Sequence, residues 1–181
     1  MNIHTGLYIH WPFCTKICPY CDFTVTRSRG ENANEWTEKY IEDLIAFREM
    51  TGTRELATIY FGGGTPSLMP PECIEKLVNA AADIFYLSEG AEITLEANPT
   101  DAEVSAFTNL RAAGINRLSL GVQSYDDRQL AFLGRNHSGG EARTAVEVAC
   151  STFESVSLDF IYGLPDENLQ MWRKRLSEIL Q

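Results

Sequence analysis

Three cysteines lie close together near the start of the chain, in the segment Cys14-Thr-Lys-Ile-Cys18-Pro-Tyr-Cys21. Thiolates are soft ligands, and three of them in one loop can bind three irons of a cubane iron–sulfur cluster. The chain has only two other cysteines, Cys73 and Cys150, and neither lies nearby in the sequence. One iron would therefore need a ligand from outside the protein, unlike the clusters of electron-transfer ferredoxins, in which cysteines bind every iron.

Two alternatives explain the same cysteines differently. A structural zinc ion prefers a closed set of four ligands, and His10 could complete such a set with the three clustered cysteines. Free cysteines can also be buried as small apolar side chains. We expect this for Cys73 and Cys150, because both fall within helical patterns.

A second candidate is the glycine-rich segment Gly62-Gly-Gly-Thr-Pro66, which follows a β-type run. Glycines let the backbone approach a ligand closely and expose its N–H and C=O groups. Glycine and proline also punctuate ordinary loops, so this segment alone is a weak signal.

Polar residues at the ends of later β-type runs add further candidates. Glu96 could accept hydrogen bonds from hydroxyl or ammonium groups of a ligand, or form a buried ion pair with Arg117. Arg135 lies in the loop beyond the fourth run. Gln123 ends one run, and Asp159 lies within the last.

Short β-type runs alternate with longer helical patterns, which predicts an α/β fold with a parallel sheet built from five βα units. The runs are rich in β-branched and aromatic residues. The expected strands are Gly6–Trp11, Ala57–Phe61, Glu92–Ala97, Arg117–Val122 and Ser155–Ile161.

Apolar residues at helical spacing predict the helices between these strands. One stripe lies in Glu35–Met50 and includes Trp36, and Ser138 with Glu141 has the spacing of a capping box. The other stripes are Ile74, Leu77, Val78, Ala81 and Phe85 in the second helix, and Leu169, Trp172, Leu176 and Ile179 in the last. We expect Trp36 and Trp172 to lie in the core.

The two faces of the expected strands differ in chemistry. Side chains alternate between faces, so one face is apolar and the other is polar. The polar set comprises Tyr8, His10, Thr94, Glu96, Ser119, Gln123, Ser157 and Asp159. A doubly wound sheet buries both faces and favours apolar runs, so a barrel or open barrel with a polar lumen explains the pattern better. The candidate residues then converge at the carboxyl ends of the strands, where barrel enzymes build their sites.

Composition narrows the function classes. The chain has 181 residues, with 44% hydrophobic and 22% charged, as in soluble globular proteins. Its 15 basic and 25 acidic residues give a net charge of −10, which argues against nucleic-acid binding. We find no apolar run that could span a membrane and no secretory signal, and the clustered thiols suit a reducing compartment, so we expect a cytoplasmic protein.

The cysteine cluster, with an aromatic residue before its third cysteine, resembles that of the radical S-adenosylmethionine (radical SAM) enzymes. Further motifs are similar to those of the oxygen-independent coproporphyrinogen oxidase family and span nearly the whole chain. They are Tyr8-Ile-His-Trp-Pro-Phe-Cys14, Tyr60-Phe-Gly-Gly-Gly-Thr-Pro-Ser67, Glu96-Ala-Asn-Pro99, Gly121-Val-Gln-Ser124, Leu133-Gly-Arg-Asn-His137 and Asp159-Phe-Ile-Tyr-Gly-Leu-Pro165.

This resemblance implies a partial (β/α) barrel of about six units, five of them present here, with a [4Fe-4S] cluster on the three cysteines. It also implies that S-adenosyl-L-methionine chelates the open iron through its amino and carboxylate groups, and that a reduced cluster cleaves it to methionine and a deoxyadenosyl radical. The residues assigned to this cofactor by resemblance are Tyr8, Tyr20, Gly63, Gly64, Thr65, Glu96, Gln123, Arg135 and Asp159. His10 and His137 are candidates for heme binding or proton transfer, with a hydrogen-bonded structural role as the alternative.

Two departures distinguish this chain from the true oxidases, which have a further cysteine two positions after the third and an N-terminal extension. Here Asp22-Phe23 follows Cys21, and only Met1 to Thr5 precedes the first strand. Both points favour the related heme-chaperone branch, with the oxidase as the runner-up. A third hypothesis, from another class, is a binding module that uses its cluster only structurally or for electron transfer and does not bind S-adenosylmethionine.

The resemblance also implies partners and extent. The expected partners are heme or a porphyrin, an electron donor such as flavodoxin or ferredoxin, and a heme-accepting respiratory protein that could itself be membrane-associated. We expect residues 1–181 to form the radical SAM core domain, without the separate C-terminal domain of the family, and to be poorly soluble or inactive alone.

Overall fold

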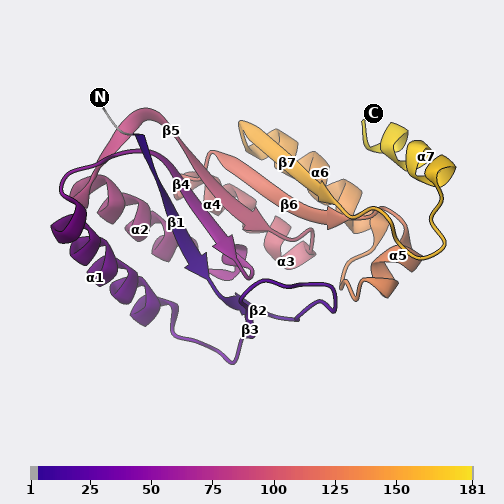
Figure 1. Cartoon of the computed structure of the whole chain (residues 1–181), viewed down its shortest axis with the longest axis horizontal. Coiled ribbons are helices and arrows are strands. Elements are labelled where there is room, and N and C mark those ends of the chain that lie inside the picture. The colour runs from indigo at the N-terminus through magenta and orange to yellow at the C-terminus, as the bar shows by residue number, and fades with distance from the viewer. Residues whose placement is uncertain (1–3, 181) are drawn as a thin grey trace.

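A five-stranded parallel sheet forms the centre of the structure, a computed structural model that describes residues 4–180 (Figure 1). The sheet order is β1-β4-β5-β6-β7, so each strand after β1 pairs with the strand of this sheet that comes before it in the chain. The strands are β1 (His4–Trp11), β4 (Glu55–Gly63), β5 (Tyr86–Ala97), β6 (Arg117–Gln123) and β7 (Ser155–Phe160). The predicted α/β fold with a parallel sheet is confirmed.

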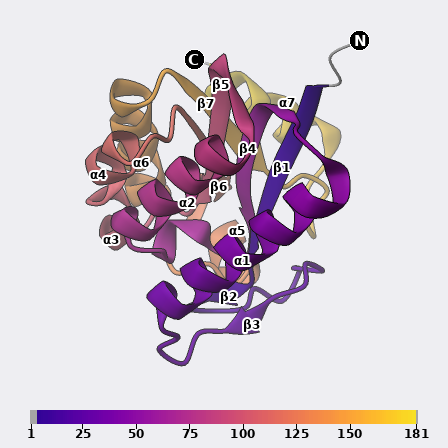
Figure 2. The same cartoon turned by 90° about the vertical axis from the view of Figure 1, so that its left-hand side faces the viewer.

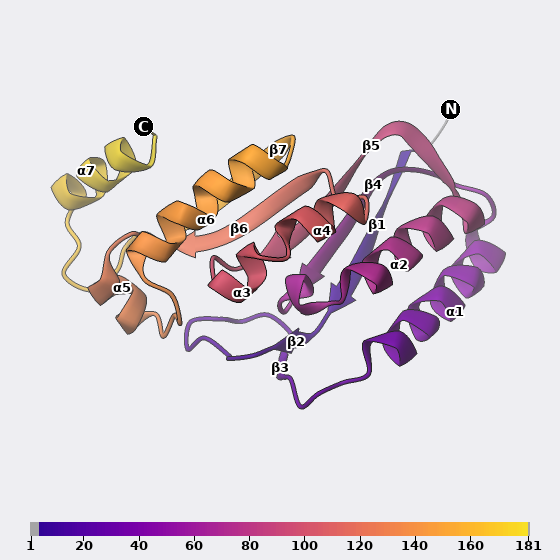
Figure 3. The ribbon, with the colours of Figure 1, turned by 180° about the vertical axis from the view of Figure 1, so that it is seen from behind.

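Helices cover one face of this sheet, as Figure 3 shows, and the opposite face is open to view in Figure 1. Figure 2 shows α1 and α2 side by side along the edge near β1. The helices are α1 (Ala33–Thr51), α2 (Pro71–Ile84), α3 (Asp101–Val104), α4 (Phe107–Ala112), α5 (Asp127–Phe132), α6 (Gly139–Thr152) and α7 (Leu169–Ile179), with a short 3-10 helix, η1 (Pro66–Leu68). No helix within the described residues is long and apolar enough to cross a membrane.

The core lies between the sheet and the helices that cover it. Alternate strand residues point into it, and α1, α2, α4 and α6 contribute buried apolar residues to it. Fully buried side chains from the strands include Leu95, Leu118, Leu120 and Val122, and those from α2 include Ile74 and Leu77. Removing this apolar surface from water is the main force that holds the layers together.

The opposite face of the sheet is polar, as the alternation predicts. The Tyr60 hydroxyl donates to Glu96 over 2.8 Å, and the Ser119 hydroxyl donates to Asp159 over 3.3 Å. Arg117 forms its ion pair with Glu92 at 3.1 Å, which contradicts the alternative in which Arg117 pairs with Glu96.

Three predictions about single side chains also need correction. Cys73 is buried, but Cys150 is exposed because it lies on the outer side of α6. Trp36 is 37% exposed and packs edge-on against Trp11 and Phe13 at the border of the core. Trp172 lies outside the core, because α7 extends away from the sheet and buries none of its residues (Figure 1).

Element boundaries agree with the sequence at most places. The predicted capping box is present at the start of α6, where the Ser138 hydroxyl and the Glu141 carboxylate bond each other's backbone N–H. The largest difference is β5, which begins at Tyr86 rather than Glu92. Its first residues pair with the start of β4, and the register then shifts, so pairing resumes only at Glu92.

Candidate functional site

A cavity of about 380 Å³ opens at the carboxyl ends of the strands. Its walls come from the loop after β2 (Phe13–Cys14) and from the ends of β4, β5, β6 and β7. Eleven of the twelve predicted site residues line it: Cys14, Cys18, Tyr20, Cys21, Gly63, Gly64, Thr65, Glu96, Gln123, Arg135 and Asp159. Residues far apart in the sequence therefore meet in one place.

The cysteine loop lies at the arrowhead end of β1 and β4 (Figure 1). It is anchored by β2, which pairs with β3 (Thr26–Arg27), and Ser28 N donates to Cys14 O over 2.8 Å. A turn in which Cys21 N donates to Cys18 O brings the other two cysteines together. Burial raises the pKa of Cys14, the Thr65 hydroxyl lowers it, and the nearby Cys21 and Cys18 raise it further. A bound cation would offset that penalty, because it stabilises the thiolate form.

The geometry does not support the zinc alternative. Within residues 4–180, no three His, Cys, Asp or Glu side chains are arranged to hold one metal ion. The His10 ring instead places Nε2 2.9 Å from the carbonyl oxygen of Thr24. A cubane cluster does not require convergence on one point, because each cysteine binds a different iron.

The glycines of the second motif pack against the segment that carries Cys14. Gly63 has φ 110°, and a Cβ there would lie 2.6 Å from the His10 ring. A Cβ on Gly64 would lie 2.8 Å from the carbonyl oxygen of Phe13. Backbone hydrogen bonds from Gly64 N to Trp11 O (2.7 Å) and from Thr65 N to Phe13 O (3.0 Å) close this contact. Only glycine allows the two segments to approach so closely.

Glu96 faces the cavity from the end of β5. Tyr60 donates to one carboxylate oxygen, and Gly63 N donates to the other over 3.1 Å. Burial raises the pKa of Glu96, while these two hydrogen bonds lower it. Burial together with Glu96 also raises the pKa of Tyr60. The carboxylate is therefore held in a fixed orientation with lone pairs available to a ligand.

Arg135 connects the cysteine loop to the sheet. Its Nη2 donates to Asn98 Oδ1 over 2.5 Å and to the Gly121 carbonyl over 2.9 Å. Its Nη1 lies 3.6 Å from Cys18 Sγ and 3.3 Å from the Tyr20 hydroxyl. The Nε atom is buried and has no partner within the described residues.

Tyr20 and Gly134 lie where the cysteine loop meets the segment that carries Arg135. Burial raises the pKa of Tyr20 to about 12, although the positive charge of Arg135 lowers it. Gly134 has φ 68°, and a Cβ there would lie 2.8 Å from Cδ of Pro19. The loop and the segment before Arg135 therefore meet at van der Waals distance.

Tyr8 is the predicted site residue that the structure leaves outside the cavity lining. It is 55% exposed and stacks on Tyr60 with ring centroids 5.8 Å apart. Its side chain lies on the polar face of the sheet. The Tyr8 hydroxyl is 3.5 Å from Nδ1 of His10.

Asn98 and Glu103 line the cavity and were not among the predicted site residues. Asn98 links Arg135 to the Thr65 hydroxyl, 3.4 Å away. Glu103 is 6% exposed and accepts hydrogen bonds from the Asn98 backbone N–H and the Ser67 hydroxyl. The position of Asn98 two residues after Glu96, on the same face at the end of one strand, could have indicated it.

His137 is buried and hydrogen-bonded to the backbone, as is typical of a structural histidine. It is 6% exposed, and Nε2 lies 3.2 Å from the carbonyl oxygen of Val122. Burial lowers its pKa to about 4, so the ring is neutral near pH 7. Nδ1 is buried without a partner within the described residues.

The donor set fits a cluster and a zwitterionic cofactor. Three thiols share the cavity with the Glu96 carboxylate and with the Arg135 cation, whose Nε has no hydrogen-bond partner among residues 4–180. A ligand that brings a carboxylate, an ammonium group and hydroxyl groups would find a partner for each of them here.

Comparison with known proteins points to the same kind of cofactor site. The model of the radical SAM superfamily matches residues 8–179. The mouse mitochondrial radical S-adenosyl methionine domain-containing protein 1 is 38% identical over 99% of this chain and 41% of its own length. The heme chaperone HemW of Escherichia coli strain K12 is 39% identical over 91% of this chain and 44% of its own length.

The structure of coproporphyrinogen III oxidase (HemN) from Escherichia coli superposes with a TM-score of 0.82 at 28% identity. The match covers 96% of this chain and 41% of that protein. This chain therefore spans about two fifths of the length of the relatives named here.

Proposed function

Because this chain belongs to the radical SAM superfamily, we propose that Cys14, Cys18 and Cys21 bind a [4Fe-4S] cluster and that the cavity beside them binds S-adenosyl-L-methionine. The observation that carries the proposal is that the three cysteines and eight further predicted residues line one cavity. A cluster used only structurally would not need the polar groups that face it.

Within this proposal each side chain has a defined task. Arg135 binds the cofactor carboxylate, and Glu96 accepts hydrogen bonds from its polar groups. Thr65, with the backbone of Gly63 and Gly64, would hold its amino end, and Tyr20 would form part of the wall beside it. Gln123 and Asp159 would contact its remaining polar atoms. Cys14, Cys18 and Cys21 would hold the cluster, which would supply one-electron chemistry for reductive cleavage of the sulfonium.

The protein's part in this chemistry is positional and electrostatic. The polar face of the sheet orients the cofactor, and the close approach of the glycine segment to Phe13 fixes Cys14 relative to it. Tyr60 and Gly63 keep Glu96 ready to accept hydrogen bonds, so little reorganisation is required when the cofactor enters.

For the biological role, we propose a heme chaperone that delivers heme to respiratory proteins and receives electrons from a flavodoxin or ferredoxin. Support comes from the heme chaperone of Escherichia coli, at 39% identity, and from Asp22-Phe23 after Cys21 in place of a fourth cysteine. The second candidate is an oxygen-independent coproporphyrinogen III oxidase, favoured by the TM-score of 0.82 to that enzyme.

Anaerobic reconstitution of the full chain with iron and sulfide tests the cofactor proposal. We expect a cluster chromophore and binding of S-adenosylmethionine, whereas release of deoxyadenosine with dithionite would overturn the expectation that residues 1–181 are inactive alone. Cys14→Ser combined with Cys18→Ser and Cys21→Ser should abolish both the chromophore and the binding, and Cys150→Ser, an exposed cysteine far from the loop in sequence, is the matched control. Tight zinc binding without an iron chromophore, or equal behaviour of both variants, would contradict the proposal.

Heme titration, run beside a porphyrinogen decarboxylation assay, separates the two biological roles. A chaperone binds heme tightly and does not decarboxylate the porphyrinogen. Decarboxylation that depends on the cluster would instead favour the oxidase.

A further inference from the structure

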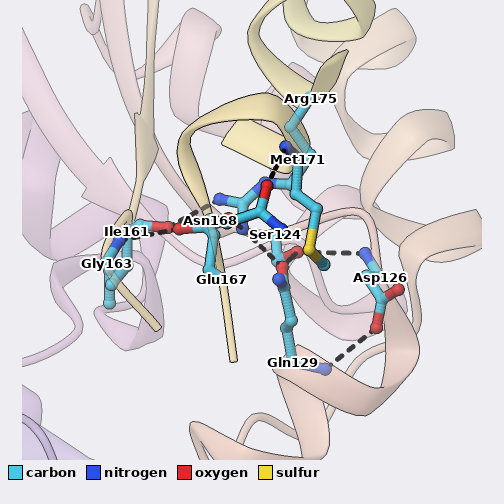
Figure 4. A network of polar contacts seen from close by, with 9 residues as sticks. All are labelled: Ser124, Asp126, Gln129, Ile161, Gly163, Glu167, Asn168, Met171 and Arg175. Atoms are coloured by element: carbon cyan, nitrogen blue, oxygen red, sulfur yellow. Dashed lines mark hydrogen bonds and ion pairs between the residues drawn. The ribbon is translucent and has the colours of Figure 1, made fainter. Parts of the chain in front are cut away.

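Arg175 of α7 lies at the centre of a polar network between α7, α5 and the end of β7 (Figure 4). Its Nη1 donates to Glu167 Oε1 over 2.5 Å and to Gln129 Oε1 over 2.6 Å, and its Nη2 donates to the Ile161 carbonyl over 2.6 Å. The side chains are largely hidden from water, with 15% of Arg175 and 2% of Glu167 exposed. Other described ion pairs of the chain have both partners at least 29% exposed.

This network attaches a helix that has no buried residue of its own. An apolar face normally fixes a helix to its domain, and here one arginine provides much of the attachment. Glu167 completes the connection, because its second oxygen accepts from Gly163 N over 2.7 Å.

The network ends at the wall of the cofactor cavity. Ile161, whose carbonyl Arg175 holds, lines the cavity and donates its N–H to the Gln123 carbonyl over 3.0 Å. On the other side, Gln129 accepts from the Ser124 hydroxyl over 2.6 Å. Arg175 therefore reaches Gln123 both through Ile161 and through the residue that follows it.

Gln123 needs such support, because it has φ 65°, in a region that residues other than glycine rarely occupy. Strained backbone of this kind persists only where the surrounding structure determines it. The side chain of Gln123 lies against Gly121. A Cβ placed on Gly121 would be only 2.9 Å from Gln123 Nε2.

We propose that Arg175 is a positioning residue for the cofactor site: it fixes the backbone of Ile161 and Gln123, and thereby the wall against which S-adenosylmethionine binds. This inference rests on the proposed function, and it assigns a role to a residue that lies outside the cavity lining.

Three variants of the full chain test it. Arg175→Met keeps an unbranched side chain and removes the donors, but it leaves the Glu167 carboxylate buried without its cation. Glu167→Gln combined with Arg175→Met removes that unpaired charge and should recover most of the loss in Tm. Arg173→Met is the matched control, because Arg173 lies on the same helix and is exposed.

The first readout is amide hydrogen exchange of the protein without S-adenosylmethionine. Exchange at the Ile161 amide should be about tenfold faster in both Arg175 variants and unchanged in Arg173→Met. The second readout is affinity for S-adenosylmethionine in the reconstituted protein. The dissociation constant should rise about five- to tenfold in both Arg175 variants, with unchanged iron content.

A purely structural role predicts a different pattern, in which affinity and amide protection recover together with Tm in the double variant. That recovery, or an Arg175→Met protein that binds the cofactor as tightly as the unsubstituted chain, would overturn the inference while leaving the proposed function intact. An unsubstituted chain that holds a cluster but binds no S-adenosylmethionine would overturn both.

Discussion

Two carboxylates of the site, the half-buried Glu96 and the buried Glu103, face hydrogen-bond donors. Glu96 accepts from Tyr60 and Gly63, and Glu103 accepts from the Asn98 backbone and the Ser67 hydroxyl. Within the described residues, neither belongs to an ion pair. Neutral donors orient a carboxylate without cancelling its charge, so Glu96 stays attractive to a cationic or hydroxyl-bearing ligand.

The buried side chain of His137 should make the stability of the protein depend on pH. Its pKa is about 4 in the folded protein and about 6.5 when unfolded, so between these values only the unfolded chain holds the proton. The free energy of unfolding should therefore fall as pH drops from 6.5 towards 4, by up to about 3 kcal/mol. Urea unfolding at several pH values measures this.

His137→Gln is the informative variant, because the glutamine amide can still donate to the Val122 carbonyl and does not titrate. It should show a shallower loss of stability between pH 6.5 and 4. A variant whose unfolding free energy has the same pH dependence as the unsubstituted chain would assign that dependence to other groups.

Sequence alone could identify the residues that belong to recognisable motifs, and the structure brings eleven of them to one cavity. It could not identify Glu103, which matters through contacts with Ser67 and Asn98 that depend on the tertiary fold. The assignment of Tyr8 to the cofactor stays a prediction, because the side chain stacks on Tyr60 and does not line the cavity. A residue's face on a strand was predictable, but its distance from the site was not.

At the scale of elements, the glycine segment after β4 and the segment that leads into the cysteine loop form one unit. Gly64→Ala should displace Pro12 and Phe13, because the new Cβ would lie 2.8 Å from their backbone atoms. We expect a loss of about 1–3 kcal/mol of stability and a lower iron content after reconstitution. Chemical denaturation and iron analysis measure the two effects.

Gly140→Ala is the control for that substitution. Gly140 lies in the first turn of α6, where a Cβ would have only the Ser138 hydroxyl nearby, at 3.9 Å. The replacement should leave iron content unchanged and stabilise the protein by about 0.5–1 kcal/mol. Equal effects of the two substitutions would show that the close contact at Gly64 is unimportant.

Periodicity predicted the elements well and their packing less well. It indicated α7 correctly, yet we expected Trp172 of that helix in the core, and no residue of α7 is buried. A helical stripe reports which residues share a face, and it does not report whether a partner lies opposite. The early start of β5 was not predicted either. Its first residues are extended because they pair with β4, and such pairing cannot be seen in the pattern of one segment.

The whole molecule combines a packed sheet with a cysteine loop that has little apolar burial of its own. Ile17 and Phe23 in the loop are 47% and 62% exposed, whereas Ile59, Phe61 and Leu95 are fully buried. Stability should therefore be unevenly distributed, with the loop at the low end.

Removal of the proposed iron–sulfur cluster should destabilise the loop much more than the sheet. Chelation of iron is expected to increase proteolytic cleavage within residues 15–30 about tenfold or more, while the sheet keeps its far-ultraviolet circular dichroism. Mass spectrometry of the early fragments locates the cuts. Cleavage spread evenly over the chain, or a cooperative loss of secondary structure, would mean that the cluster stabilises the entire domain.

The order of strands in the sheet has a consequence for biosynthesis. Each strand of the five-stranded sheet after β1 hydrogen-bonds to the strand of that sheet that comes before it in the chain, so when a new strand leaves the ribosome its neighbour has already been made. This sheet can grow one strand at a time during translation, without waiting for a distant segment. The three cysteines that we propose as iron ligands lie between β1 and β4 in the sequence, so all of them leave the ribosome before most of the sheet has been synthesised.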